Sequence, residues 1–147
     1  SIYRDDRGPV LNRHAVDACV RLLDWTPRAV VALHPEGTRS QGDDPYSFLP
    51  PKPGVGRIAL RSRAPVVPSF VAGLPRTFGA LLKERVTPGV EPVRVFVGSP
   101  VQLDDLYDQA DSKEAHHEAA VRTMAAIGAC AEQDRAFMAE WRAGRAG

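Results

Sequence analysis

The chain has 147 residues, of which 44% are apolar and 25% charged, and its 19 basic and 18 acidic side chains leave a formal net charge of +1. These values fit one domain with its own hydrophobic core, and they exclude a disordered tail, a collagen-like fibre, a disulfide scaffold and a general nucleic-acid binder. The near-neutral total conceals an asymmetry, because residues 1–100 carry a formal +5 and residues 101–147 a formal −4.

The first half of the chain alternates predicted helices and strands. Apolar residues recur with a period near 3.6 over residues 12–25 and again over residues 54–63, which predicts two amphipathic helices. Residues 29–33 form a short apolar run bounded by prolines, as in a buried strand. Residues 41–53 are rich in Pro, Asp and Gly and are predicted to form a loop.

The second half continues the pattern. Residues 65–72 and 92–97 are enriched in valine and phenylalanine and predict two more strands. From Asp111 to about Ala143 the chain is predicted to be helical, with Asp111 and Glu114 spaced as a variant of the capping box.

Together these elements predict an α/β fold with a mixed, largely parallel sheet flanked by helices. We expect residues 1–110 to form this domain and residues 111–147 to form a C-terminal helix that packs on it. The sequence begins at Ser1 without a methionine or a start signal, and we expect an N-terminal part of the domain to be missing from it.

Two further patterns bear on the environment of the protein. Cys19 and Cys130 lie in predicted helices and belong to no CxxC pair, so we expect buried free thiols, as in a reducing compartment. The longest uncharged stretch, residues 64–75, contains three prolines and is shorter than the roughly 20 apolar residues that a membrane-spanning helix needs. We therefore expect no transmembrane helix.

The most informative segment is residues 30–40, Val-Val-Ala-Leu-His-Pro-Glu-Gly-Thr-Arg-Ser. Polar side chains that follow a buried strand lie at the carboxyl edge of the sheet, where open α/β sheets bind ligands. Gly37 permits positive φ and close approach of a ligand, and the guanidinium of Arg39 suits an anion. The pattern predicts an anion-binding turn, but an ordinary turn with an ion pair between Glu36 and Arg39 fits the spacing equally well.

The run His34-Pro-Glu-Gly-Thr-Arg-Ser resembles the Phe-Pro-Glu-Gly-Thr-Arg-Ser block of the glycerolipid acyltransferases, the family of the bacterial lysophosphatidic acid acyltransferases. Three other segments support the resemblance in order and spacing, and together the matches cover residues 1–72. Leu49-Pro-Pro-Lys-Pro-Gly54 is similar to the family's Pro-Phe-Lys-x-Gly segment, Ala64-Pro-Val-Val-Pro68 to its Val-Pro-Val-Val-Pro block, and Ile2-Tyr-Arg4 to the end of its block closing in Asp-Arg.

The resemblance implies an acceptor site with two parts. The residues that hold the acceptor's phosphate would be Arg4, Arg39 and Lys52, and the residues that shape the rest of the site would be Glu36, Gly37 and Thr38. A phosphomonoester carries nearly two negative charges and several acceptor oxygens, so two arginines and a lysine match its chemistry. Glu36 cannot bind phosphate, and we expect it to orient Arg39 or a hydroxyl group of the acceptor.

Members of this family transfer the acyl group with a histidine followed five positions later by an aspartate, and the histidine acts as general base on the acceptor hydroxyl. None of the four histidines here has an aspartate at that position. We therefore expect no catalytic residue within residues 1–147 and no acyl transfer by this chain alone. The family's block precedes the segment that contains Arg4, so truncation explains its absence better than loss of function. We expect His34 to be a structural residue.

The resemblance further implies acyl transfer from acyl-CoA or acyl carrier protein to lysophosphatidate, giving phosphatidate in bacterial phospholipid biosynthesis. The thioester donor needs no metal or other cofactor. The expected partners are a lysophospholipid, the acyl donor and the cytoplasmic surface of the cell membrane, bound peripherally, and no nucleic acid is expected. The alternative is a non-catalytic module that binds lipid phosphates or a membrane surface.

Three surface features each leave two interpretations. A basic helix face with Arg57 and Arg61, followed by Arg63 and Arg76, could rest on anionic lipids or have partners within the chain. His116 and His117 could mimic a metal site, but a solvated helix face is the better prediction. An apolar series at helical spacing either packs on the domain or contacts a membrane; its members are Met124, Ile127, Phe137, Met138 and Trp141.

Overall fold

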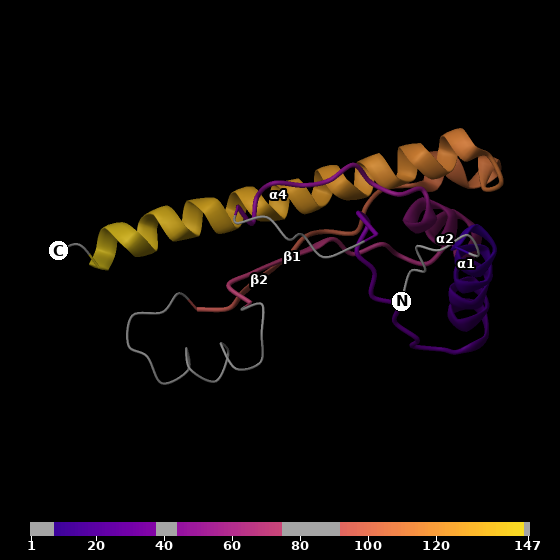
Figure 1. Cartoon of the computed structure of the whole chain (residues 1–147), viewed down its shortest axis with the longest axis horizontal. Helices are drawn as coiled ribbons and strands as arrows, with labels where there is room; N and C mark the ends of the chain where they lie inside the picture. Colours follow the sequence, from indigo (N-terminus) through magenta and orange to yellow (C-terminus); the bar gives the residue numbers. More distant parts are fainter. Residues whose placement is uncertain (1–7, 38–43, 75–91, 146–147) are drawn as a thin grey trace.

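The computed structural model describes residues 8–37, 44–74 and 92–145. In chain order they contain the helices α1 (Gly8–Trp25) and α2 (Gly54–Ser62), the strands β1 (Ser69–Ala72) and β2 (Arg94–Val97), the 3-10 helix η1 (Asp104–Gln109) and the helix α4 (Lys113–Arg145). Figure 1 shows an elongated arrangement in which α4 follows the long axis, the two strands lie beside it, and α1 and α2 are gathered at one end.

The first predicted helix is present as α1, but it begins earlier than predicted, at Gly8 instead of Asn12. Proline at position 9 fits the first helical turn, because its missing N–H would have no partner there. Beyond the helix, Arg28 has φ 69°, in the left-handed region that residues other than glycine seldom adopt. This reversal directs the chain into residues 29–37.

The second predicted helix is present as α2, which packs against both α1 and α4. Ile58, Ala59 and Leu60 are buried. A Cβ atom added at Gly56 would come within 2.0 Å of the carbonyl oxygen of His116 in α4. Glycine at this position therefore lets α2 approach the backbone of α4.

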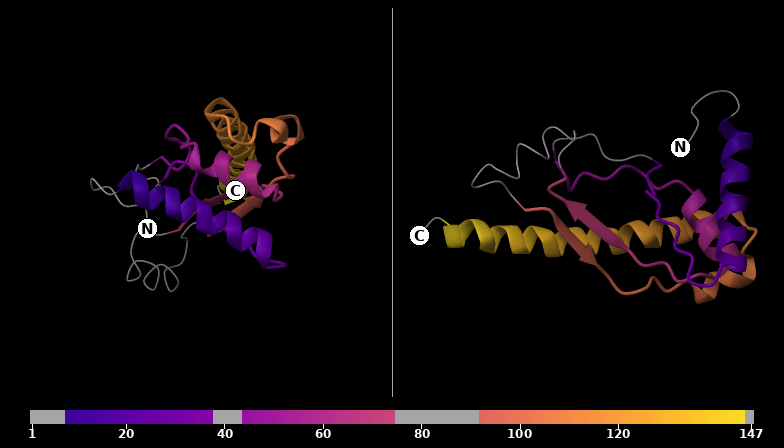
Figure 2. Two further views of the ribbon diagram at one scale, coloured as in Figure 1. Left: turned by 90° about the vertical axis from the view of Figure 1, so that its right-hand side faces the viewer. Right: turned by 90° about the horizontal axis from the view of Figure 1, so that it is seen from below.

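Strands β1 and β2 pair in antiparallel orientation, with Ser69 opposite Val97. The pairing continues past the strand ends, because the Gly98 N–H donates to the Pro68 carbonyl at 3.0 Å and the Val101 N–H donates to the Val66 carbonyl at 2.9 Å. In the right-hand view of Figure 2 the strand pair lies beside α4, which extends past it toward the C-terminus.

The sheet of the described residues thus has two antiparallel strands, and the mixed, largely parallel sheet stays a prediction. Residues 29–33, predicted as a buried strand, form neither helix nor strand, and Val30 is 86% exposed. The composition of this run is typical of a strand. A strand also requires a hydrogen-bonded neighbour, and none of the described residues supplies one.

The last predicted helix is present as α4, which begins two residues later than Asp111 and has a different cap. The hydroxyl of Ser112 accepts a hydrogen bond from the Ala115 N–H at 3.3 Å and donates to Glu114 at 2.9 Å. The N-cap is therefore Ser112. The backbone N–H of Glu114 and the Ser112 hydroxyl both stabilise the carboxylate, and they lower the pKa of Glu114.

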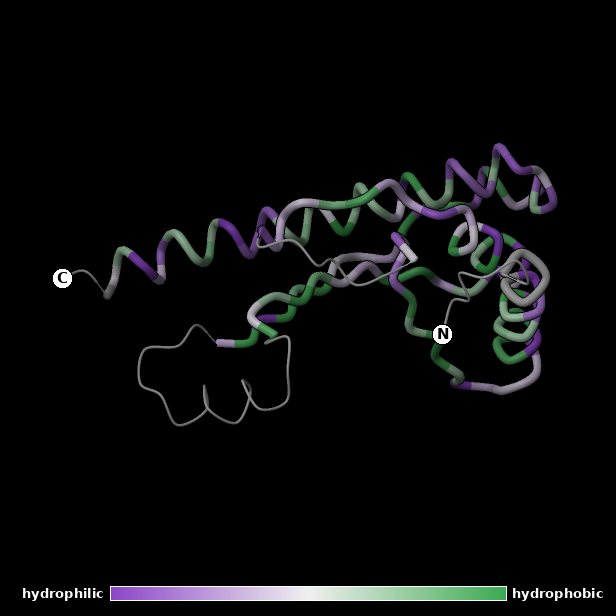
Figure 3. The backbone as a smooth tube through the Cα atoms, viewed as in Figure 1, coloured by the Kyte–Doolittle hydropathy of each residue, from purple (hydrophilic) through white to green (hydrophobic). Residues whose placement is uncertain are grey.

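Two clusters of buried side chains form the core. The first joins α2, η1 and the start of α4, and the second joins β1 to the middle of α4. Figure 3 shows the strand pair as largely hydrophobic, whereas the C-terminal part of α4 alternates between hydrophilic and hydrophobic residues. Met138 is buried, and Phe137 meets Phe96 edge to face with 6.2 Å between ring centroids. These two members of the apolar series pack on the domain.

Both cysteines are free thiols, as predicted. Cys130 is buried, which confirms the predicted burial, whereas Cys19 is only half-buried. Within the described ranges, no helix is both long enough and apolar enough to cross a membrane.

Candidate functional site

The segment His34–Gly37 forms the turn that the sequence predicts. The Gly37 N–H donates to the His34 carbonyl at 2.9 Å, which closes the turn. Gly37 has φ 76°, a conformation that glycine adopts without the steric cost that a side chain would add. The turn therefore depends on glycine at this position, and it carries Pro35 and Glu36 at its tip.

A second hydrogen bond connects this turn to the segment that precedes α2. The Lys52 N–H donates to the Pro35 carbonyl at 2.7 Å. Glu36 and Gly37 in one segment are thereby brought close to Lys52 in another. The other predicted site residues, Arg4, Thr38 and Arg39, lie outside the described residues.

Lys52 also lies at the N-terminus of α2. Pro53 is the N-cap, and no side chain caps the first turn by a hydrogen bond. The N–H groups of the first helical turn carry the partial positive charge of the helix. An anion bound by the exposed side chain of Lys52 would therefore lie near this positive helix end.

Glu36 contributes a carboxylate oxygen that needs a partner. Its Oε2 atom is buried and has no hydrogen-bond donor among the described residues. An unsatisfied buried polar atom costs about 1–3 kcal/mol, and more when it is charged. A ligand hydroxyl or a guanidinium group at this position would remove that cost.

Three residues of the turn, His34, Pro35 and Glu36, line a cavity of about 1090 Å³. Residues 29–33 and 65–74 line it as well. The helices α1, α2 and α4 contribute apolar side chains to the lining: Leu23, Val55, Ile58, Ala59, Met124 and Ile127. His34 and Glu36 add polar groups to this mainly apolar lining.

The loop that leads to Lys52 is anchored to the core by aromatic side chains. The hydroxyl of Tyr46 donates to Asp134 at 2.8 Å, and its ring stacks on Phe70 with 5.7 Å between centroids. The guanidinium of Arg135 lies 4.5 Å from the centre of the Tyr46 ring. Phe48 meets Phe70 edge to face at 6.2 Å. These contacts fix the chain ahead of Lys52 against β1 and α4.

A buried ion pair supports this anchor. Asp134 is fully buried, and the guanidinium of Arg94 donates to both of its carboxylate oxygens, from Nε to Oδ1 and from Nη2 to Oδ2. Burial by itself raises the pKa of Asp134, but the hydrogen bonds from Arg94 and Tyr46 outweigh it, and the pKa lies below its usual value. Burial and the neighbouring carboxylate raise the pKa of Tyr46.

The matched part of the chain contains most of these features. Residues 6–72 match the model of the family described as Acyltransferase. Residues 6–72 belong to the acyltransferase family. No curated protein and no solved structure matches the chain.

The acyltransferase segment includes α1, the turn at Gly37, Lys52, α2 and β1. The resemblance read from the Pro-Glu-Gly-Thr-Arg-Ser block is therefore confirmed at the level of the family, and the general chemistry is acyl transfer. Asp134 and Arg94, which anchor the loop before Lys52, lie outside the matched residues. Sequence reasoning missed this pair because nothing in the pattern connects a charge in a strand with one on a distant helix.

The basic face has partners within the chain. Arg57 and Arg61 of α2 both pair with Asp17 of α1, at 3.3 Å and 2.9 Å. Arg63 lies over the ring of Tyr107, 5.3 Å from its centre. Of the two interpretations of this face, the structure therefore favours the one with intramolecular partners, which hold α1 against α2.

The two adjacent histidines differ in environment. His116 is buried, and its Nε2 lies 2.6 Å from the Ala110 carbonyl, whereas His117 is exposed. Within the described ranges, no group of three His, Cys, Asp or Glu side chains is placed to hold a metal ion. The side chain of His34 is exposed at the edge of the cavity.

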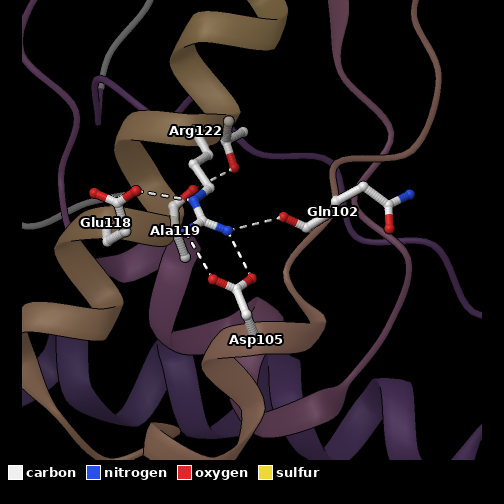
Figure 4. Close-up of polar contacts among 6 residues, drawn as sticks. Gln102, Asp105, Glu118, Ala119 and Arg122 are labelled. Atoms are coloured by element: carbon white, nitrogen blue, oxygen red, sulfur yellow. Dashed lines mark hydrogen bonds and ion pairs between the residues drawn. The ribbon is translucent and has the colours of Figure 1, made fainter.

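Arg122 is the centre of a polar cluster between η1 and α4 (Figure 4). Its Nη atoms donate to both oxygens of Asp105 at 2.7 Å and 2.8 Å, its Nε donates to Glu118 at 2.9 Å, and Nη1 also reaches the Gln102 carbonyl at 3.3 Å. The hydrogen bonds from Arg122 lower the pKa of Asp105. The cluster joins η1 to α4. Of its contacts, the sequence signals only the i,i+4 spacing of Glu118 and Arg122.

Proposed function

We propose that the acyltransferase segment binds the phosphate of a lysophospholipid acceptor, and that the complete polypeptide transfers an acyl group to lysophosphatidate. The observation that carries this proposal is the hydrogen bond from the Lys52 N–H to the Pro35 carbonyl. It brings a lysine and the N-terminus of α2 next to the turn at Gly37, inside a segment that belongs to the acyltransferase family.

Each of these groups has a defined task in the proposed site. The ammonium of Lys52 and the first-turn N–H groups of α2 bind the phosphate. Arg39 and Arg4 complete the phosphate site, as the resemblance implies. The buried oxygen of Glu36 accepts a hydrogen bond from a hydroxyl group of the glycerol unit. The carboxylate thereby orients the acceptor and gains a donor that none of the described residues supplies.

The proposed reaction starts from a thioester, acyl-CoA or acyl carrier protein. The acceptor hydroxyl oxygen forms an ester bond to the acyl carbon, the carbon–sulfur bond breaks, and the hydroxyl proton ends on the released thiol. The general base would be the histidine of a His-x-x-x-x-Asp pair. Residues 1–147 contain no such pair. We therefore expect this chain to bind the acceptor and not to transfer the acyl group by itself.

An assay of acyl transfer tests the proposal. The complete polypeptide is incubated with labelled acyl-CoA and lysophosphatidate in vesicles, as wild type and as Lys52→Ala, with Lys113→Ala as control because Lys113 is an exposed lysine at the start of α4. A lost charge-assisted hydrogen bond of about 1.5–3 kcal/mol corresponds to a rise of roughly 10- to 150-fold in the KM for the acceptor. The control should retain its KM.

Two results would contradict the proposal. Transfer that proceeds equally well to a lysophospholipid without a terminal phosphate group would show that the phosphate is not recognised. Acceptor binding without any transfer by the complete polypeptide would identify the alternative, a non-catalytic module that binds lipid phosphates.

A further inference from the structure

The position of Lys52 depends on the loop that precedes it. Lys52 is exposed, and its backbone N–H donates to the Pro35 carbonyl at 2.7 Å. The residues before it, 48–51, make no backbone hydrogen bond to any described residue. The path of the chain toward Lys52 is therefore set by side-chain contacts farther up the loop.

Tyr46 makes the most extensive of these contacts. Its hydroxyl donates to Asp134 of α4 at 2.8 Å, its ring stacks on Phe70 of β1, and the guanidinium of Arg135 lies 4.5 Å from the ring centre. The nearby ring of Phe48 meets Phe70 edge to face. The loop is thereby held against β1 and α4 six residues before Lys52.

The carboxylate that accepts the bond from Tyr46 is itself held in place. Asp134 is fully buried, and Arg94 donates to both of its oxygens. The Oδ2 atom accepts one hydrogen bond from Arg94 and one from the Tyr46 hydroxyl. A buried carboxylate is stable only with its partners in place, so this group offers the tyrosine a fixed acceptor. The anchor therefore has a rigid base in α4 and β2.

The segment between this anchor and α2 is stiff. Proline fixes its own φ and restricts the backbone of the residue before it. In the sequence Leu-Pro-Pro-Lys-Pro at 49–53, every residue either is a proline or precedes one. Few backbone rotations are therefore free between the aromatic anchor and Lys52, and a shift of the anchor is passed on to the lysine.

We propose that Tyr46 is a positioning residue of the acceptor site, whose hydrogen bond to Asp134 holds Lys52, through the proline-rich segment, where it meets the acceptor's phosphate. This inference rests on the proposed function, because Tyr46 acts only through Lys52. A loop without the bond holds the lysine in place for part of the time, and the apparent affinity for the acceptor falls by that fraction. Tyr46 takes no part in the transfer step itself. The acceptor site then also depends on Asp134, which lies outside the family match to residues 6–72.

Acyl transfer by the complete polypeptide tests this proposal through the separation of KM from kcat. Tyr46→Phe removes the hydroxyl and keeps the ring, and Tyr107→Phe is the matched control, because it removes a tyrosine hydroxyl from η1. Tyr46→Phe should raise the KM for lysophosphatidate at least about threefold and leave kcat within about twofold of wild type, whereas Tyr107→Phe should change neither. An unchanged KM, or a fall in kcat alone, would overturn the proposal.

A double variant tests whether Tyr46 acts through Lys52. In the Lys52→Ala background, Tyr46→Phe should raise KM by less than about 1.5-fold, because the group that it positions is already absent. Full additivity of the two effects would overturn the proposal. Failure of this inference is distinguishable from failure of the proposed function. A raised KM in Lys52→Ala with wild-type KM in Tyr46→Phe overturns this inference alone, and wild-type KM in Lys52→Ala overturns both.

Two proline variants test the stiff segment independently, and they decide the matter if Tyr46→Phe does not fold. Pro51→Gly keeps the anchor and frees the chain between it and Lys52, whereas Pro100→Gly frees an exposed loop between β2 and η1. Both changes loosen the unfolded chain to a similar extent. Pro51→Gly should raise the KM for lysophosphatidate at least about threefold, and Pro100→Gly should leave it within about 1.5-fold of wild type. Equal KM values for the two variants would overturn the proposal.

Discussion

Two aspartate–arginine pairs in this fold have similar geometry and opposite burial, which allows a direct prediction about stability. In each pair the guanidinium donates to both carboxylate oxygens. The side chains of Asp134 and Arg94 are 0% and 7% exposed, whereas those of Asp105 and Arg122 are 60% and 33% exposed. Asp134→Asn should therefore destabilise the protein far more than Asp105→Asn does.

The expected size follows from burial. Removal of one partner of a buried ion pair leaves an uncompensated charge and typically costs about 3–5 kcal/mol. For a domain of this length, 1 kcal/mol lowers Tm by about 2–4 °C, so Asp134→Asn should lower Tm by about 6–20 °C. Asp105→Asn removes a contact that water and salt already screen, and its Tm should stay close to that of wild type.

Thermal and urea unfolding monitored by circular dichroism measure both variants. The double variant Arg94→Met with Asp134→Leu completes the experiment, because it removes both buried charges and should be less destabilised than Asp134→Asn. Equal losses of stability for Asp134→Asn and Asp105→Asn would refute the argument from burial. A double variant that is less stable than the single variant would refute the argument from uncompensated charge.

Further predictions concern pH and the contact between α2 and α4. The pKa of Asp134 is lower in the folded state than in the unfolded state, so its pairing stabilises the fold above the unfolded pKa and is lost as pH falls through the folded pKa. As the pH is lowered below about 4, the urea concentration at the unfolding midpoint should therefore decrease. The decrease should be less steep in Asp134→Asn. Gly56→Ala should cost at least about 1–3 kcal/mol in urea unfolding, because its Cβ would strike the His116 carbonyl. Gly128→Ala, with open space around the added Cβ, should raise the free energy of unfolding by about 0.5–1 kcal/mol. A Gly56→Ala variant that is as stable as Gly128→Ala, or more stable, would contradict this packing.

Local patterns in the sequence were sufficient to predict α1, α2, α4 and the turn, but not η1. The period of apolar residues indicated α2, and the placement of Gly37 after Pro35 and Glu36 indicated a turn that needs positive φ. These features depend on residues close together in the chain. The cap of α4 was misplaced by one residue, because Ser112 and Asp111 are both good capping residues.

Contacts between distant residues could not be predicted in this way. The pairing of β1 with β2, the pair of Arg94 with Asp134 and the contact of Gly56 with α4 all depend on how elements pack. Residues 29–33 show this most clearly. Their composition predicts a strand, but a strand forms only where a neighbouring strand supplies backbone hydrogen bonds. The candidate site was predicted from a family resemblance. The structure adds that a backbone hydrogen bond from Lys52 to Pro35 holds Lys52 next to the turn.

Binding of lysophosphatidate to residues 1–147 is the most direct test of the central claim that the turn and Lys52 form a phosphate site. Isothermal titration calorimetry with a short-chain lysophosphatidate should show binding that inorganic phosphate competes with. Lys52→Ala should weaken it by roughly 10- to 150-fold, while Lys113→Ala should leave it unchanged. The same affinity for wild type and Lys52→Ala, or equal binding of the acceptor without its phosphate, would contradict the claim.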